Sequence, residues 1–101
     1  GLARDSVNLA LDGVPRGIDL AKVSDYLAGL EGVAEVHDLH IWAMSTAENA
    51  MTAHLVMPAG HPGDDFFADV VEHIEHQFAI GHVTIQIETG RACALAPDHV
   101  V

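Results

Sequence analysis

The chain is poor in cysteine and in basic residues, and both shortages restrict what the protein can be. The single cysteine, Cys93, excludes an internal disulfide and a structural zinc site built from several thiolates, and it fits a reducing compartment. Lysine and arginine number 4 against 15 acidic residues, which gives a formal net charge of −11. Such a field repels phosphate, so the composition argues against nucleic acid and anionic membrane surfaces as partners, and it favours cations.

Long apolar runs are missing as well. No uninterrupted stretch reaches the about 18 residues that a membrane span requires, and no signal peptide is recognisable. A chain of 101 residues, half of them hydrophobic, is typical of one domain with a single core. We therefore expect one domain over residues 1–101, with a loosely held tail over 90–101. The abrupt start at Gly1 is expected of a fragment of a longer protein.

Histidine is abundant, with eight copies in the chain. An acidic, histidine-rich surface suits divalent metal, although a soluble acidic surface with incidental histidines is an equally simple interpretation. The run from Val36 to Trp42 is β-branched and aromatic and predicts a strand that carries His37, Asp38 and His40. Two imidazoles and a carboxylate within four residues are either a metal-binding cluster or ordinary polar residues of a strand edge.

Two amphipathic helices are predicted from apolar residues that recur at three- and four-residue steps. The first runs from about Asp19 to Leu30, with Asp19 as a good N-cap and glycines around its end. The second runs to about Phe78, and Asp64 or Asp65 is expected to cap its start. Both apolar stripes predict core contacts rather than binding grooves.

Three strands are predicted at residues 34–44, 50–57 and 82–88. The short polar link between the first two makes them an antiparallel hairpin. Residues 6–11 also alternate, and they predict either a further short strand or the tail of a helix. The resulting order, (β)αββαβ, is that of an α+β ferredoxin-like open sheet with both helices on one face.

A single layer of helices covers only one face of such a sheet, so the opposite face, called here the open face, is expected to be exposed. Strand alternation places His54, Gln86 and Glu88 on the open face. An exposed sheet face that mixes apolar and ligand-type residues predicts a partner surface, most simply one for an identical chain.

The first strand leaves two alternatives for its histidines. Regular alternation puts His40 and Trp42 on the open face with His54. A β-bulge before Leu39 would instead turn His37 to that face. On a regular strand the two histidines lie in opposite phase and do not form one local cluster.

Three blocks in order carry a family resemblance: Gly32-Val33 with Val36-His37-Asp38-Leu39-His40-Ile41-Trp42, then Thr52-Ala53-His54-Leu55, and last His82-Val83-Thr84-Ile85-Gln86-Ile87-Glu88. They resemble the C-terminal cytoplasmic domain of cation diffusion facilitator transporters, closest to the bacterial zinc, cobalt and cadmium efflux members. The resemblance implies a metallochaperone-like fold and a homodimer that binds divalent metal near the subunit interface. It also implies that residues 1–17 are a linker from the membrane transport domain of the same polypeptide, in the inner (cell) membrane.

The resemblance also implies a ligand set. His37, His54 and Glu88 stand at ligand positions of the family, and Asp65 stands where some relatives present a ligand from the opposite subunit. Some relatives have histidine at the position of Gln86, which is a weaker candidate here. His40 is the other weaker candidate. Zinc is the expected metal, with cadmium or cobalt as alternatives, because more carboxylate and less imidazole relaxes zinc selectivity.

The remaining ligand-type residues have simpler explanations. His73 and His76 stand three apart on the second predicted helix, a spacing that can hold a metal, but the neighbouring glutamates favour a solvated polar face. Cys93 and His99 lie in the tail, where nothing fixes them. The three methionines are expected as core or interface filler.

The sequence therefore predicts the cytosolic metal-sensing and dimerisation domain of a divalent-cation efflux transporter, with no catalytic chemistry of its own. Metal-free protomers of charge −11 are expected to repel and to splay, and zinc between them to favour a closed dimer. Zinc binding should weaken as the pH falls through about 6.5, because ligating imidazoles must be deprotonated. The alternative is a freestanding soluble metal carrier or ligand-sensing module of the same fold.

Overall fold

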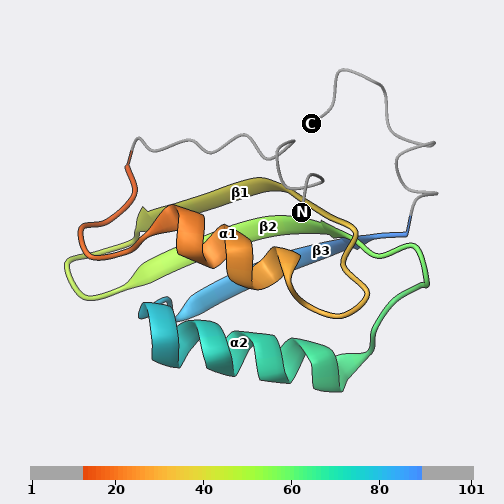
Figure 1. Ribbon diagram of the computed structural model, residues 1–101. Helices are drawn as coiled ribbons and strands as arrows, with labels where there is room; N and C mark the ends of the chain where they lie inside the picture. Colours follow the sequence, from red (N-terminus) through yellow and green to blue (C-terminus); the bar gives the residue numbers. More distant parts are fainter. Residues whose placement is uncertain (1–12, 90–101) are drawn as a thin grey trace.

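The structure is a computed structural model that describes residues 13–89 of the chain. The elements follow the order α1 (Leu20–Ala28), β1 (Glu35–Ala43), β2 (Asn49–Val56), α2 (Asp64–Phe78) and β3 (His82–Glu88) (Figure 1). This order confirms the predicted αββαβ succession of an α+β, ferredoxin-like fold. The segment 6–11, predicted as a short strand or the tail of a helix, and the tail at 90–101 lie outside the described residues. Neither described helix is both long and apolar enough to cross a membrane.

Helix α1 begins as the sequence predicts. Asp19 is the N-cap with an extended backbone, and its carboxylate accepts a hydrogen bond of 3.2 Å from the backbone N–H of Lys22. Leu20, Val23 and Leu27 are buried on the side that faces the sheet. The helix ends at Ala28, two residues before the predicted Leu30.

The predicted cap of helix α2 is wrong. Gly63 is the N-cap, with a φ of 96° and no side-chain capping bond, and Asp64 and Asp65 occupy the first helical turn. Carboxylates in that position are still favourable, because they interact with the positive end of the helix dipole. Val70 and Ile74 are the two α2 residues that become fully buried.

The sheet has the order β1-β2-β3, with β2 in the centre (Figure 1). Strands β1 and β2 are antiparallel, which confirms the predicted hairpin, and β2 and β3 are parallel. The parallel pair follows from the chain order, because α2 carries the chain back along the sheet between β2 and β3.

A β-bulge interrupts β1 between the two histidines. His37 pairs with His54 and His40 pairs with Thr52, so Asp38 and Leu39 together face one residue of β2. Asp38 absorbs the extra residue with a φ of 53°, in the left-handed region. Because His54 and Thr52 lie two apart on β2, both histidines of β1 face the same side. The interpretation that they lie in opposite phase assumed a regular strand, and the bulge overturns it.

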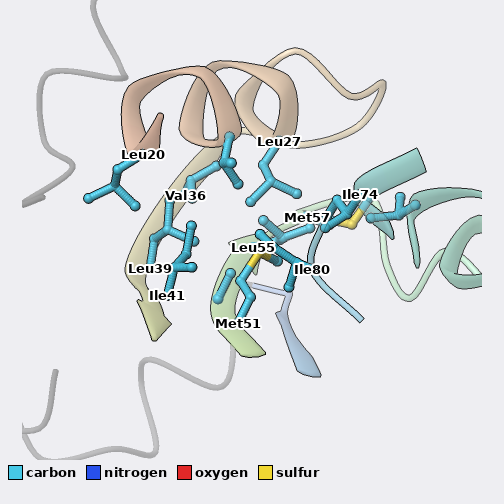
Figure 2. Packing of buried hydrophobic residues seen from close by; sticks show 13 residues of the cluster. Leu20, Leu27, Val36, Leu39, Ile41, Met51, Leu55, Met57, Ile74 and Ile80 are labelled. Carbon is cyan, nitrogen blue, oxygen red and sulfur yellow. The ribbon is translucent and has the colours of Figure 1, made fainter. Parts of the chain in front are cut away.

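Both helices cover the same face of the sheet, as predicted, and they share one core with its strands (Figure 2). The two helices also touch each other, since the rings of Tyr26 and His73 stack with centroids 4.0 Å apart. Met44, expected as core or interface filler, is 54% exposed and therefore not part of the core. The other two methionines are in the buried set, which is Leu20, Val23, Leu27, Val36, Leu39, Ile41, Met51, Ala53, Leu55, Met57, Val70, Ile74 and Ile80.

Candidate metal site

Each of the three strands contributes one residue to a group on the open face. His37 of β1 stands directly opposite His54 of β2, and Glu88 ends β3 two residues beyond Gln86, the parallel neighbour of His54. The sheet thus brings together residues that are 51 and 34 positions apart in the chain. His37, His54 and Glu88 each offer one ligand atom, and these three atoms lie within 4.8 Å of one another. Among residues 13–89, these three side chains form the group that could hold a metal ion.

The Glu88 carboxylate bridges the two imidazoles. Its Oε1 lies 2.8 Å from Nε2 of His37, and its Oε2 lies 2.8 Å from Nδ1 of His54. The two rings meet edge to face, with centroids 5.2 Å apart and planes at 71°. Each histidine donates the N–H that faces Glu88, so the protons occupy the space between nitrogen and oxygen where a metal ion would bind.

Glu88 is only 6% exposed, and it is the one buried carboxylate among the described residues. Burying a charged carboxylate is costly unless hydrogen bonds or a cation compensate it. The two histidine side chains, each 27% exposed, provide that compensation and leave one side of the group accessible. A buried anion beside two half-exposed imidazoles attracts a cation.

Asp38 brings a second carboxylate to the same group. Its Oδ2 lies 3.4 Å from Nδ1 of His37 and 3.4 Å from Nδ1 of His54, at ion-pair range. The geometry makes neither contact a hydrogen bond, and Oδ2 is buried without a hydrogen-bond partner. From the sequence, Asp38 was a possible member of a local metal-binding cluster with His37 and His40, but it was not in the ligand set that the family resemblance implies. Aspartate adopts the left-handed backbone conformation more readily than most residues, and Asp38 has this conformation in the bulge. An aspartate within the strand was therefore the sequence feature that could have indicated the bulge.

The dimensions of the group fit zinc. Zinc bonds to nitrogen and oxygen of about 2.0–2.2 Å place neighbouring ligands of a tetrahedron about 3.3–3.6 Å apart. The ligand atoms of His37, His54 and Glu88 are separated by 2.8 Å in the two hydrogen bonds and by no more than 4.8 Å overall. Small side-chain rotations therefore suffice to admit the ion.

The other candidate ligands do not join this group in a single chain. Gln86 is exposed on β3 beside His54, and His40 is exposed beyond the bulge opposite Thr52. Asp65 is exposed in the first turn of α2, outside the group.

Three further histidines have other contacts. His73 is exposed, as predicted for a solvated polar face, and its ring also stacks on Tyr26. His82 forms an exposed pair of 3.3 Å with Glu48. His76 is exposed in the last turn of α2, where a positive charge would suit the helix dipole. Cys93 and His99 lie outside the described residues.

The contact between the helices shifts the pKa of one side chain, Tyr26. Partial burial raises the pKa of the Tyr26 phenol above its ordinary value of 10.0, and the negative charge of Asp69 raises it further. This group lies on the helical layer, away from the open face.

The fold and the site together define a small ferredoxin-like α+β domain with a two-histidine, carboxylate-rich group on its exposed sheet face. Residues 15–90 match the family described as the cation efflux protein cytoplasmic domain. The chain belongs to this family, the cytoplasmic domain of cation diffusion facilitators, and the family resemblance found in the sequence is confirmed.

The similar proteins include efflux transporters of bacteria. The metal cation efflux system protein CzcD of Cupriavidus metallidurans is 38% identical over 88 residues, which are 86% of this chain and 28% of that protein. The cadmium, cobalt and zinc/H(+)-K(+) antiporter of Bacillus subtilis is 32% identical over 91 residues, which are 87% of this chain and 29% of that protein. The chain thus spans less than a third of the length of these relatives.

A solved structure has the same fold. It is the metal-bound C-terminal domain of the CzcD transporter from Cupriavidus metallidurans, with a TM-score of 0.63 and 36% sequence identity. The similarity covers 70% of this chain and 99% of that domain.

Proposed function

We propose that this chain is the metal-sensing cytoplasmic domain of a divalent-cation efflux transporter, and that it binds zinc through His37, His54 and Glu88. The observation that carries the proposal is the buried Glu88 carboxylate held between two imidazoles on the open face. Two nitrogens and one oxygen form a donor set of the kind that zinc accepts. A set with this much carboxylate relaxes selectivity, so cadmium and cobalt are alternative ions.

The names of the relatives support a transporter rather than a freestanding metal carrier. One is a metal cation efflux system protein and the other an antiporter of cadmium, cobalt and zinc, and the matched segment is a fraction of each. We place this chain on the cytoplasmic side of the inner membrane, joined through its N-terminal segment to the membrane domain of the same polypeptide. Six hydrophobic spans upstream in the full gene would exclude the freestanding carrier or ligand-sensing module.

The proposal includes a homodimer formed through the open face. Trp42 and Met44 are the exposed large hydrophobic side chains among the described residues, at 41% and 54%, and they stand at the end of β1 and just beyond it. Burying them against a second copy removes apolar surface from water. Asp65 of a second copy is the residue proposed to reach the metal across this interface, and His40 and Gln86 are the weaker candidates beside the site.

Metal would act on the dimer through charge. Two copies of net charge −11 repel each other, and each divalent ion bound near the interface cancels part of that repulsion. An ion that binds the closed arrangement more tightly than the splayed one shifts the population by the ratio of the two affinities. The closed dimer would then bias the membrane helices through residues 1–17.

Calorimetric zinc titration tests the binding proposal. The wild-type chain should bind zinc, and His54→Ala should lose most of the affinity because one ligand is removed. His76→Ala is the matched control, since His76 is an exposed histidine of α2 outside the group. If His54→Ala binds zinc with the stoichiometry and affinity of wild type, the proposed site is wrong. Small-angle scattering of the same samples should show a more compact dimer with zinc than without it.

A further inference from the structure

Asp38 directly follows His37 in the chain, yet its carboxylate reaches the His37 ring. On a regular strand neighbouring side chains point to opposite faces. The bulge and the left-handed backbone of Asp38, with a φ of 53°, bring Oδ2 to 3.4 Å from Nδ1 of His37. This backbone conformation is unfavourable for a residue other than glycine, and strain of this kind concentrates at functional sites.

The two nitrogens of the His37 ring face different carboxylates. Nε2 lies 2.8 Å from Oε1 of Glu88, whereas Nδ1, the other ring nitrogen, lies 3.4 Å from Oδ2 of Asp38. A neutral imidazole has one N–H donor and one acceptor nitrogen. Because Nε2 donates to Glu88, Nδ1 carries no proton, and it meets Oδ2 as one acceptor facing another.

This proton arrangement explains why Oδ2 of Asp38 is buried without a hydrogen-bond partner. Oδ2 also lies 3.4 Å from Nδ1 of His54, but that nitrogen directs its proton to Oε2 of Glu88 at 2.8 Å. Neither imidazole therefore has a proton left for Asp38. A buried acceptor without a donor is costly, so the metal-free group holds the Asp38 carboxylate in an unfavourable state.

We propose that Asp38 is a positioning residue for the metal ligand His37. When His37 ligates through Nε2, the one proton of its neutral ring lies on Nδ1, and Oδ2 of Asp38 gains the donor that it lacks. A carboxylate that accepts the second N–H of a ligating histidine fixes the ring orientation and makes the ligand more basic. Asp38 thus favours the metal-bound state. The proposal rests on the proposed function, because it requires metal at His37, His54 and Glu88.

Zinc calorimetry measures what Asp38 contributes to binding. Asp38→Gly should lower the zinc affinity about 10–100-fold, the range expected when a group behind a ligand is lost, and glycine accepts the left-handed backbone. Asp38→Asn is the second variant. It should also weaken binding, because its amide can donate to the unprotonated Nδ1 and stabilise the metal-free ring. Asp25→Asn removes a charge from an exposed position of α1 and should leave the affinity within about threefold of wild type. Circular dichroism without metal should show that the variants are folded.

Nitrogen NMR of the histidine rings tests how Asp38 acts, independently of affinity. The proton of His37 should lie on Nε2 in the metal-free chain and on Nδ1 in the zinc-loaded chain. The resonance of this Nδ1 proton should be visible in wild type and lost to exchange with water in zinc-loaded Asp38→Gly, because its acceptor is gone. His54 is the internal control, since its Nδ1 faces Glu88. In the zinc-loaded chain its proton should lie on Nε2 in both proteins.

Three results would each overturn the positioning role. They are a zinc-loaded His37 with its proton on Nε2, a folded Asp38→Gly or Asp38→Asn with wild-type zinc affinity, and an Nδ1 resonance of His37 that survives in Asp38→Gly. In each case a loss of affinity in His54→Ala still supports the proposed function. If His54→Ala binds zinc as wild type does, the proposed function fails, and the role of Asp38 fails with it.

Discussion

His37 and His54 face each other across the β1–β2 pair, and each contacts a different oxygen of the same Glu88 carboxylate at 2.8 Å. Three strands are thereby linked through one buried side chain on the sheet face that the helices leave uncovered. The metal-free arrangement is a hydrogen-bonded form of the site that we propose for zinc, because a proton on each imidazole stands where the ion would bind.

Zinc should stabilise the fold through this site. A ligand that binds only the native state adds about 2.7 kcal/mol of unfolding free energy at 100 times its dissociation constant. Urea unfolding of wild type should shift by this amount when zinc is added, and the shift should vanish with excess chelator. His76→Ala should behave as wild type, and a full zinc-dependent shift in His54→Ala would contradict the assignment.

Asp38→Asn should raise the stability of the metal-free chain. Asparagine tolerates the left-handed backbone, and its amide can donate a hydrogen bond where Oδ2 of Asp38 is buried without a hydrogen-bond partner. We expect a gain of about 1 kcal/mol in metal-free urea unfolding, the usual value of one satisfied buried polar group. A loss of stability without metal would show that Asp38 supports the fold instead.

Trp42→Ala should weaken the zinc-bound dimer at least about tenfold, or about 1.4 kcal/mol, because tryptophan is enriched among the residues that contribute most to an interface. Sedimentation equilibrium in the presence of zinc measures the dissociation constant. Gln77→Ala, on the exposed side of α2, is the control and should have no effect. An unchanged dimer in Trp42→Ala would place the interface elsewhere.

Asp19→Ala should destabilise the chain by about 0.5–2 kcal/mol, because the N–H of Lys22 loses its capping acceptor. Asp19→Asn should stay close to wild type, since the asparagine side-chain oxygen accepts the same bond. Thermal and urea unfolding without metal measure both. Equal losses in the two variants would assign the effect to charge rather than to capping.

Tyr26 should titrate above pH 10.0, because burial and then Asp69 raise its pKa. The folded state keeps the phenolic proton where the unfolded state has begun to lose it. The contribution to stability is therefore complete below pH 10.0 and is lost as the pH rises through the folded pKa. The ultraviolet absorbance of phenolate follows the one tyrosine of the chain.

Two variants that each remove one negative charge from α2 test the cause of the Tyr26 shift. Asp69→Asn should move the midpoint of the Tyr26 titration down towards 10.0. Asp64→Asn, in the first turn of α2, should not move it. If both variants titrate as wild type does, burial alone accounts for the shift.

Much of this protein was predictable from local sequence patterns. Helical and strand periodicities placed the five described elements within a few residues, and β3 matched at both ends. The Asp19 cap followed from local chemistry as well. The second cap did not, because Gly63 begins α2 without a side-chain bond, and the two aspartates that follow it resemble caps in sequence alone.

The family and the candidate ligands were also recognisable in the sequence, because the three blocks carry them in order. The arrangement of the site depended on tertiary structure. Periodicity is a property of one strand, whereas the bulge at Asp38 exists only in the pairing of β1 with β2. That pairing puts both histidines of β1 on one face, leaves the Asp38 carboxylate between His37 and His54, and buries Glu88 against the two imidazoles.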